Sequence, residues 1–584
     1  VETVAHYRAA AHFNPDVDFI IDIGGQDMKC FKIRNGAVDS IMLNEACSSG
    51  CGSFIETFAK ALGYDIASFA RLGLFTQKPV NLGSRCTVFM NSSVKQAQKD
   101  GASVEDISAG LSISIVKNAI YKVIRAASAD DLGRHIVVQG GTFHNDAVLR
   151  AFEQELGRDV TRPTIAGIMG AFGAALAARD LKLKASALLD AKALEGFTHS
   201  AKPVTCNLCT NHCSLTVNSF DGGRRFISGN RCSRPLGKEK AELPDLYRWK
   251  YEKLRAMEGK GLGDGSRGRI GLPFGLNMYE NLPFWYALFT RLNFEVVLSP
   301  ESSRKLYIKG QRTIPSDTVC YPAKLLHGHV QALVEAGVDA IFYPCMSYNF
   351  DEKTADNNYN CPVVAYYPEL LAANMPDLKK TRFLNPYAGL HRPKDYERIG
   401  SQWFADTFGV PRREAASAIR AAYQAYDRYK EEIHHTGRQY IEQARAQGLP
   451  IIVLAGRPYH IDPEINHGIN DLITSFGFVV VSEDAVAWLE DYAPRKVLNQ
   501  WTFQARMYNA ARYVCEQPDM QLVQLVSFGC GTDAITGDEV RSILEQGGKL
   551  YTQLKIDDIS NLGAVKIRVR SLMAAMEERK RHDN

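Results

Sequence analysis

The sequence has no apolar run long enough to cross a bilayer and no excess of charge of one sign. Its longest apolar run, Ile165–Ala178, is short, rich in Gly and Ala, and flanked by Arg162 and Arg179, which favours a close-packed internal helix. The 69 basic and 65 acidic residues leave a formal net charge of +4, too small for the basic field of a nucleic-acid or membrane-surface binder. We therefore expect a soluble, cytoplasmic protein without nucleic-acid or membrane partners.

Targeting signals, internal repeats and low-complexity tracts are also missing. A chain of 584 residues is expected to form three or more domains. It begins at Val1 inside a run with helical spacing and no capping residue ahead of it. This start predicts a C-terminal fragment of a larger fused protein, with further motifs upstream.

Cysteine is abundant, with 13 residues. Most of them form three groups: one follows a glycine-rich turn, one lies in a short polar segment, and one is spread over the C-terminal half. Grouped thiols without a secretion signal favour metal or iron–sulfur ligation over disulfides.

The order of short apolar runs and helical patterns predicts an α/β protein in four parts. Residues 17–46 predict three strands, and helical patterns alternate with a further strand up to residue 182. Residues 183–245 lose this pattern and carry the second cysteine group. The predicted parts are residues 1–182, 183–245, 246–411 and 412–584.

Two predictions concern the last two parts. The apolar runs at 340–346 and 361–367 predict strands of the third part. The charged and alanine-rich stretch at 412–447 predicts one or two long surface helices, which link the third part to the fourth.

A glycine turn follows the first predicted strand, in the sequence Asp22-Ile23-Gly24-Gly25-Gln26-Asp27. Its glycines let backbone N–H groups approach an anion closely, and Asp22 and Asp27 could hold Mg²⁺ or orient its water. Taken alone, the same residues also suit an ordinary tight hairpin.

A second glycine pair, Gly140-Gly141, ends a predicted strand and opens a helix, a suitable place for a nucleoside or phosphate. Five motifs now follow one another in order: DIGGQD, NEACSSGCGSFIE, GSRCTVF, QGGTFHNDAVLRAFEQELG and GIMGAFGAALAA. With these motifs, residues 1–180 resemble the ATP-dependent activators of 2-hydroxyacyl-CoA dehydratases and benzoyl-CoA reductases, which belong to the actin/hexokinase/heat-shock ATPase superfamily.

The resemblance implies one lobe of an actin/hexokinase-like ATPase domain. In it, Asp22–Asp27 would be the second phosphate motif, including Gln26, and Gly140-Gly141 the adenosine motif. Cys47 and Cys86 would ligate a [4Fe–4S] cluster shared between two such domains. The implied cofactors are thus ATP, Mg²⁺ and [4Fe–4S] clusters, and the implied partners are a second activase-type domain, upstream or in a second subunit, and an electron donor such as ferredoxin or flavodoxin.

Two departures from the family pattern stand out. The first phosphate motif is absent, so the chain holds at most half of an ATP site. Cys51 stands where the single-domain activators usually have a small polar residue, and it is either an alternative ligand or a buried thiol.

The middle group contains four cysteines in a turn-rich segment: Cys206, Cys209, Cys213 and Cys232. Zinc and [4Fe–4S] both accept four thiolates. Three of the ligands crowd one end and the fourth is remote, a spacing closer to iron–sulfur sites than to a paired zinc ribbon. An iron–sulfur centre is therefore favoured, and zinc is the alternative.

In the C-terminal half, Cys320, Cys345 and Cys530 each stand at a predicted strand end or ahead of a helix, where ligands gather in open α/β sheets. Residues 268–584 resemble the dehydratase-type subunits that accept the activator's electrons. This implies a two-subdomain, Rossmann-like α/β region in which these three cysteines hold a [4Fe–4S] or double-cubane cluster. Cys361 is the candidate fourth ligand, and Cys515 is interpreted as structural.

The loop after the strand at 450–456 offers Arg457 and His460 as catalytic candidates. Arg457 could bind a carboxylate or phosphate of a substrate, and His460 could donate a proton, although a solvated loop fits the sequence equally well. The expected function is ATP-dependent, low-potential electron transfer that drives a reductive step, such as dehydration of an acyl-CoA-like 2-hydroxyacyl thioester. The alternatives are a non-catalytic iron–sulfur scaffold or redox sensor, and a zinc-stabilised kinase-like enzyme.

Overall fold

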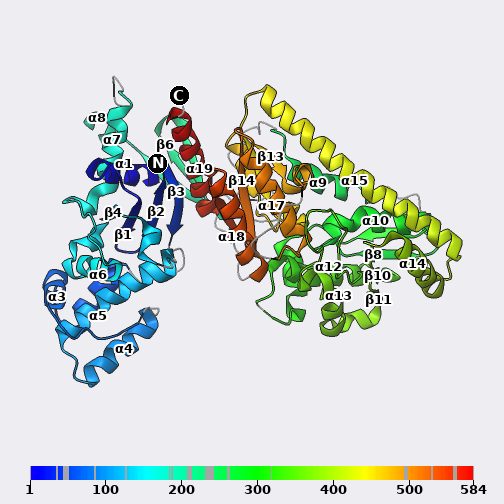
Figure 1. Cartoon of the computed structure of the whole chain (residues 1–584), viewed down its shortest axis with the longest axis horizontal. Coiled ribbons are helices and arrows are strands. Elements are labelled where there is room, and N and C mark those ends of the chain that lie inside the picture. Colours follow the sequence, from blue (N-terminus) through cyan, green and yellow to red (C-terminus); the bar gives the residue numbers. More distant parts are fainter. Residues whose placement is uncertain are drawn as a thin grey trace. The chain divides into compact units, whose positions relative to one another are not determined.

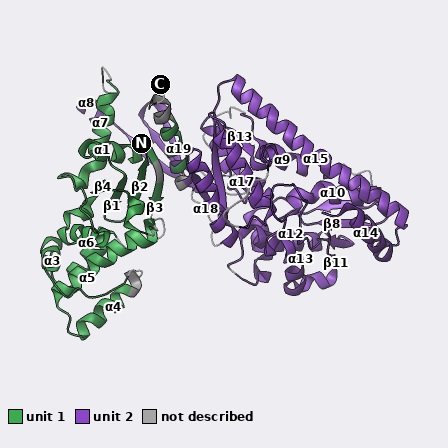
Figure 2. Cartoon of the chain, in the orientation of Figure 1, with its two compact units in different colours: residues 1–189, 568–584 green, residues 190–567 purple. Residues whose placement is uncertain are grey.

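The computed structural model forms two compact units, residues 1–189 with 568–584 and residues 190–567 (Figures 1 and 2). It describes residues 2–34, 37–43, 51–83, 87–124, 126, 128–182, 185, 188–206, 214–229, 243–258, 264–316, 318–491, 498–527, 530–556 and 562–582.

Unit 1 is built on a four-stranded sheet in the order β3-β2-β1-β4. β1 pairs antiparallel with β2 and parallel with β4, and β2 pairs antiparallel with β3. The strands are β1 (Phe19–Ile23), β2 (Met28–Arg34), β3 (Ala37–Leu43) and β4 (Ile136–Gln139). The predicted strands of residues 17–46 and the later strand are thereby confirmed.

Helices cover both faces of this sheet, which explains why every residue of β1 is buried. The helices are α1 (Glu2–Phe13), α2 (Gly52–Ala61), α3 (Ile66–Gly73), α4 (Thr87–Lys99), α5 (Val104–Lys117), α6 (Asp146–Leu156) and α7 (Met169–Asp180). On one face, Phe19, Ile21 and Ile23 pack in a core with residues of helices α2 to α6. On the other face, Ile20 packs in a second core with residues of helices α1 and α7.

Helix α5 continues through a π-helical segment to Ile124, and residues 104–124 are long and apolar enough to cross a membrane. Of its most apolar 18-residue window, 61% is buried inside the protein. Among the described helices no other passes this test. The apolar composition is therefore accounted for by the core of unit 1.

Unit 2 begins with α8 (Ala191–Glu195) and a three-stranded antiparallel sheet of β5 (His199–Thr205), β6 (Ser214–Phe220) and β7 (Arg225–Ser228). The sequence predicts no strands in this segment, because these strands contain many polar residues. β5 is exposed along its whole length, so it lacks the apolar alternation that marks a half-buried strand.

Two parallel sheets follow, and both have the same strand order. In chain order the second, first, third and fourth strands lie side by side, as β9-β8-β10-β11 and as β13-β12-β14-β15. The strands are β8 (Arg269–Leu272), β9 (Glu295–Leu298), β10 (Ala340–Phe342), β11 (Arg382–Leu384), β12 (Ile451–Ala455), β13 (Val479–Ser482), β14 (Met520–Ser527) and β15 (Thr552–Ile556).

Helices connect these strands, as parallel pairing requires. The longest is α15 (Arg412–Ala446), yellow in Figure 1, which confirms the predicted helix at 412–447 as a single element. The other connecting helices are α10 (Met278–Arg291), α11 (Arg304–Gly310), α12 (Tyr321–Glu335), α13 (Pro362–Asn374), α14 (Pro393–Phe408), α16 (Ile469–Ser475), α17 (Thr502–Cys515) and α18 (Gly531–Gln546). Helix α9 (Leu246–Arg255) precedes β8, and helix α19 (Leu562–His582) follows β15.

One predicted strand is wrong. Residues 361–367 begin helix α13 instead, with Cys361 as the N-cap and Pro362 in the first turn. Pro at the first helical position suits a helix start, whereas it would remove a hydrogen bond from a strand. The apolar run of Val363 and Val364 was too short to distinguish the two by its pattern.

Candidate functional site

The glycine turn joins β1 to β2 and is held by the segments that lie against it. The Gly24 N–H donates to the Asp27 carbonyl (2.9 Å). The Gly24 carbonyl accepts from Gly52 N–H (3.0 Å) and from the Thr142 hydroxyl (2.9 Å). The start of α2 and the segment after Gly141 therefore fix the turn from two sides.

The second glycine pair lies directly beside this turn. β1 and β4 run in parallel with Asp22 opposite Gln139, so Gly140 lies beside Ile23, the last residue of β1. Gly140 has a φ of +95°, and a Cβ there would lie 2.3 Å from the Ile23 carbonyl oxygen. By contrast, a Cβ on Gly25 or Gly141 would meet nothing within 4 Å. The structure thus brings the two predicted glycine motifs together and leaves backbone at both accessible.

Asp22 and Asp27 differ in exposure. The Asp27 carboxylate is 59% exposed and pairs with Lys29 (3.0 Å). The Asp22 carboxylate is mostly buried and lies 2.9 Å from both Nδ1 of His6 and the donating Nε2 of Gln139. Sequence reasoning missed both contacts. His6 lies outside the quoted motifs, and α1 reaches Asp22 only through the fold; Gln139 opens the QGGTFHNDAVLRAFEQELG motif, but its pairing with Asp22 depends on the parallel register of β1 and β4.

The two cysteines expected to bind the N-terminal cluster, Cys47 and Cys86, lie outside the described residues. Cys51 is the N-cap of α2, is fully buried and packs in the same core as Phe54 and Phe58. Of the two readings given for Cys51, its packing favours the buried thiol.

Most of the middle cysteine group also lies outside the described residues, namely Cys209, Cys213 and Cys232. Cys206, at the end of β5, is buried and packs against Leu215 and Ile227 of the antiparallel sheet.

Three cysteines of unit 2 share one backbone position, because each is the N-cap of a helix. Cys320 precedes α12, Cys361 precedes α13 and Cys530 precedes α18. The pKa of the Cys320 thiol is raised to about 12, mainly by burial; the thiols of Cys361 and Cys530 also raise it, and the Ala323 N–H and Arg457 lower it. Burial likewise raises the pKa of Cys361; Arg457 lowers this pKa and Cys530 raises it. The three thiols and Arg457 therefore occupy one neighbourhood, called here the three-cysteine site.

The loops that form this site leave the carboxyl ends of strands in both parallel sheets. Cys361 ends the connection that follows β10, Arg457 follows β12, and Cys530 follows β14. Carboxyl ends of parallel strands are where ligands bind in open α/β sheets.

Arg457 supports the site from the inside. Its side chain is 3% exposed and forms an ion pair with buried Asp533. The guanidinium also donates to the Cys530 sulfur (3.3 Å) and to the Thr532 hydroxyl (3.1 Å). These contacts occupy the donors expected to bind a substrate carboxylate, so Arg457 positions Cys530 rather than facing an external anion.

His460 was the second catalytic candidate, and it is fully buried. Its Nδ1 accepts from the Arg457 backbone N–H (3.1 Å), and its Nε2 has no hydrogen-bond partner among the described residues. Burial and Arg457 lower the pKa of the imidazole well below its usual value, so it is neutral at neutral pH.

Cys345 occupies a different setting from the three thiols. It follows β10, and its backbone pairs with the segment after β11, through Pro386 (2.9 Å) and Ala388 (2.9 Å). Burial and the carboxylate of Glu369 raise the pKa of its thiol to about 11. The structure therefore groups Cys361, the candidate fourth ligand, with Cys320 and Cys530; Cys345 lies two residues after Tyr343, in the segment that pairs with the chain after β11.

The loop that leads to Cys361 is closed at its base by backbone pairing. Asn360 N–H donates to the Ser347 carbonyl (3.0 Å), and Asn349 N–H donates to the Asn358 carbonyl (2.7 Å). The loop thus forms a compact unit that ends one residue before Cys361.

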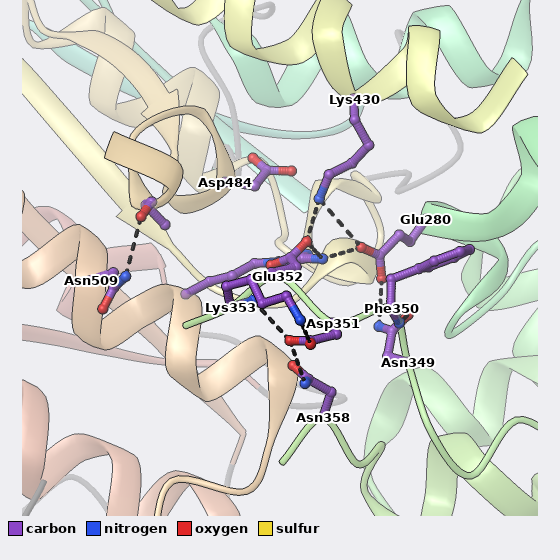
Figure 3. A network of polar contacts seen from close by, with 12 residues as sticks. Glu280, Asn349, Phe350, Asp351, Glu352, Lys353, Asn358, Lys430, Asp484 and Asn509 are labelled. Carbon is purple, nitrogen blue, oxygen red and sulfur yellow. Dashed lines mark hydrogen bonds and ion pairs between the residues drawn. The ribbon is translucent and has the colours of Figure 1, made fainter. Parts of the chain in front are cut away.

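A buried charge network, drawn in Figure 3, holds the tip of this loop. Glu352 accepts from Arg506 of α17 (2.7 Å) and from Lys430 of α15 (2.6 Å). Arg506 also bonds to Glu280 of α10, which accepts from Asn349 (3.2 Å). Three helices therefore fix the loop, and through it the position of Cys361.

Within the described part of the chain, no three His, Cys, Asp or Glu side chains are placed to hold a single metal ion. The ligands of a four-iron cluster bind different iron atoms and are accordingly spaced further apart than those of one ion.

Comparisons with known proteins identify both halves of the chain. A family model described as the BadF/BadG/BcrA/BcrD ATPase family matches residues 1–178, and one described as a CoA enzyme activase uncharacterised domain matches residues 269–486. These matches confirm the resemblance found in the sequence, and the first confirms the actin/hexokinase-like ATPase fold of that region.

Two curated relatives agree with this assignment. The chain is 34% identical to the 2-hydroxyisocaproyl-CoA dehydratase activator of Clostridioides difficile, over 31% of this chain and 66% of the relative. It is 30% identical to the activator of lactoyl-CoA dehydratase of Anaerotignum propionicum, over 31% of this chain and 70% of the relative. A solved activator of the 2-hydroxyisocaproyl-CoA dehydratase from Clostridium difficile, with bound ADPNP, is 31% identical over 32% of this chain and 71% of that chain, with a TM-score of 0.29.

The chain spans just under two thirds of the first of these relatives. On the match of residues 1–178 and the identity to these activators, the chain belongs to the BadF/BadG/BcrA/BcrD ATPase family and also carries a CoA enzyme activase domain.

Proposed function

We propose that this chain takes part in ATP-dependent, low-potential electron transfer through iron–sulfur centres. Unit 1 would contribute half of the ATPase site, and the three-cysteine site of unit 2 would receive the electron. The family match and the names of the relatives, which are activators of acyl-CoA dehydratases, support this proposal. The observation that carries it is the set of three partly buried N-cap cysteines, with Arg457 bonded to one of them, Cys530.

The residues of the glycine site fit a nucleotide phosphate and its magnesium ion. Open space around Gly25 and Gly141 lets an anion approach the backbone N–H groups, and no side chain blocks either position. Asp27 is exposed enough to bind the ion or its water, and Asp22 is held in place by His6 and Gln139.

The residues of the three-cysteine site fit an iron–sulfur cluster. Each thiol stands at a helix N-terminus, where the helix dipole favours negative charge, and Arg457 adds a fixed positive charge. Burial raises the pKa of the free Cys320 and Cys361 thiols, but a coordinated thiol loses its proton outright. Three thiolates would leave one iron of a [4Fe–4S] cluster open to an outside ligand.

The chain's own residues would set the properties of this centre. When bound, the cluster supplies one-electron chemistry and a coordination position. The hydrogen bond from Arg457 to Cys530 stabilises the thiolate, and Asp533 keeps the guanidinium fixed. Burial excludes water, which strengthens each of these electrostatic contacts. The reaction proposed is a reductive step such as dehydration of a 2-hydroxyacyl-CoA.

The remaining cysteines complete the proposed electron path. Cys47 and Cys86 would ligate a [4Fe–4S] cluster shared with a second activase-type domain. Cys206, Cys209, Cys213 and Cys232 would hold a further centre in the segment between the two α/β regions.

Metal analysis of cysteine variants tests the proposal. The chain is purified without oxygen, and iron, sulfide and zinc are quantified in the parent and in Cys320→Ser, Cys361→Ser, Cys530→Ser and Cys345→Ser. Cys515→Ser is the matched control, because Cys515 ends α17 outside the site, where its thiol donates to the Ile543 carbonyl (3.5 Å). We expect the first three variants to lose iron and sulfide together while the control retains both. Unchanged iron in all three, or zinc in place of iron, would contradict the proposal.

A further inference from the structure

The phenol of Tyr343 is an unpaired hydrogen-bond donor beside the three-cysteine site. Tyr343 directly follows β10 and is fully buried, and its backbone N–H donates to the Leu384 carbonyl (2.9 Å). Its hydroxyl has no hydrogen-bond partner among the residues that the structure describes. A buried hydroxyl without a partner is destabilising, so its presence calls for a reason.

The surroundings of Tyr343 point to the cysteines. The backbone N–H of Met346, three residues on, donates to the carbonyl of Ala365 in the first turns of α13 (3.1 Å). This contact draws the segment after β10 against the helix that Cys361 caps. Burial is the main cause that raises the pKa of the phenol well above its usual value, and Tyr367 and the thiols of Cys345, Cys361 and Cys320 add to it.

A second phenol in the same neighbourhood shows what a satisfied hydroxyl looks like here. Burial and, to a smaller extent, the Cys320 thiol also raise the pKa of Tyr367, on α13. The hydroxyl of Tyr367, however, is hydrogen-bonded to Nε2 of His327 (3.0 Å). Nδ1 of His327 in turn contacts the Thr313 hydroxyl (2.7 Å). The fold therefore pairs the phenol of Tyr367 internally and leaves the phenol of Tyr343 without a partner among the described residues.

Resting on the proposed function, we propose that the Tyr343 hydroxyl donates a hydrogen bond to a sulfide of the cluster held by Cys320, Cys361 and Cys530. Hydrogen bonds to cluster sulfurs stabilise the reduced, more negative state and so raise the reduction potential. Tyr343 is thus assigned as a positioning and tuning residue of this centre rather than as a ligand.

The test compares Tyr343→Phe with Tyr429→Phe. Tyr429 is a matched control, because its hydroxyl is also buried without a partner among the described residues, and the groups that act on it are Asp484, Glu280 and Glu432 rather than thiols. Both variants and the parent are reconstituted anaerobically with iron and sulfide. The signal of this centre is identified as the one that Cys530→Ser lacks, and its midpoint potential is measured.

We expect Tyr343→Phe to retain iron but to show a lower midpoint potential than the parent, while Tyr429→Phe matches the parent. In the metal-free protein both variants should be at least as stable as the parent, because each removes an unpaired buried hydroxyl. A parent-like potential in Tyr343→Phe would overturn the inference. So would a loss of metal-free stability in Tyr343→Phe alone, which would reveal an internal partner. If the parent itself takes up no iron at these cysteines, the proposed function fails and the inference falls with it.

Discussion

Adjacent glycines of unit 1 meet different physical limits. Gly140 has a positive φ and no room for a Cβ beside Ile23, whereas Gly141 is open. L-residues adopt such a φ only with strain, and here the strain adds to a steric clash with a backbone oxygen. The first glycine is therefore required by the fold, and the second is free to serve a ligand.

Gly140→Ala should consequently destabilise unit 1 by about 3 kcal/mol or more, because the strain and the clash add. Gly141→Ala is the matched control and should change stability by less than about 1 kcal/mol. Denaturant unfolding of both variants measures the difference. Equal stabilities would show that Gly140 can relax and that its conformation is not imposed by β1.

Among the elements, α10, α15 and α17 meet at the loop before Cys361 through buried charges. Arg506 lies between Glu280 and Glu352, and both Arg506 and Glu280 are almost fully buried. A buried ion network adds little stability over apolar residues, but removing one partner leaves uncompensated charge. The network therefore acts mainly as a fixed anchor for the loop.

Arg506→Met should lower the free energy of unfolding by about 3–5 kcal/mol, since Glu280 and Glu352 lose their guanidinium partner. Arg420→Met is the control, because Arg420 is 57% exposed and pairs with Glu397 at the surface, where such pairs contribute at most about 1 kcal/mol. Chemical denaturation compares the two. We also expect Arg506→Met to retain less iron, because the loop positions Cys361; full iron retention would argue against that role of the loop.

Acid should weaken the same anchor. Burial alone would raise the pKa of Glu352, but Arg506 and Lys430 outweigh it and lower the value to about 2. An acid with a depressed folded-state pKa contributes stability that is complete above its unfolded pKa of about 4.3 and is lost as pH falls through the folded value. The parent should therefore lose stability between about pH 4.5 and pH 2 more steeply than Glu352→Gln, as followed by urea unfolding at each pH. Parallel curves would contradict the assigned pairing.

The elements also show where pattern reasoning succeeds. Strand β12 is a continuous apolar run followed by turn residues, and it was predicted correctly. α13 was not, because Val363 and Val364 suit a strand as well as a helix, and the helix start depends on Pro362. That error had a consequence for the site, because a helix start at Cys361 places its thiol beside the other N-cap cysteines.

For the whole molecule, the sequence located each cysteine group and both glycine motifs, since these depend on short local patterns. It could not supply contacts made by the fold alone, such as His6 with Asp22 or Arg457 with Asp533. The sequence offered Arg457 as a ligand for a substrate anion. It could not reveal that the guanidinium is buried, because this burial depends on α18, which begins 74 residues later along the chain.

The last prediction concerns ATP hydrolysis by the chain as a whole. Phosphoryl transfer needs groups on both sides of the triphosphate, to hold it in line and to neutralise its charge. Unit 1 supplies the turn at Gly24-Gly25 and the pair Gly140-Gly141, but the sequence contains no first phosphate motif. We therefore expect the isolated 584-residue chain to hydrolyse Mg²⁺–ATP at or near the background rate. Addition of a separately produced activase-type domain that carries the missing motif should raise the rate, and Gly141→Ala should reduce that rise because its Cβ enters the open space. Robust hydrolysis by the chain alone, measured as phosphate release and unaffected by Gly141→Ala, would show that the nucleotide is held elsewhere.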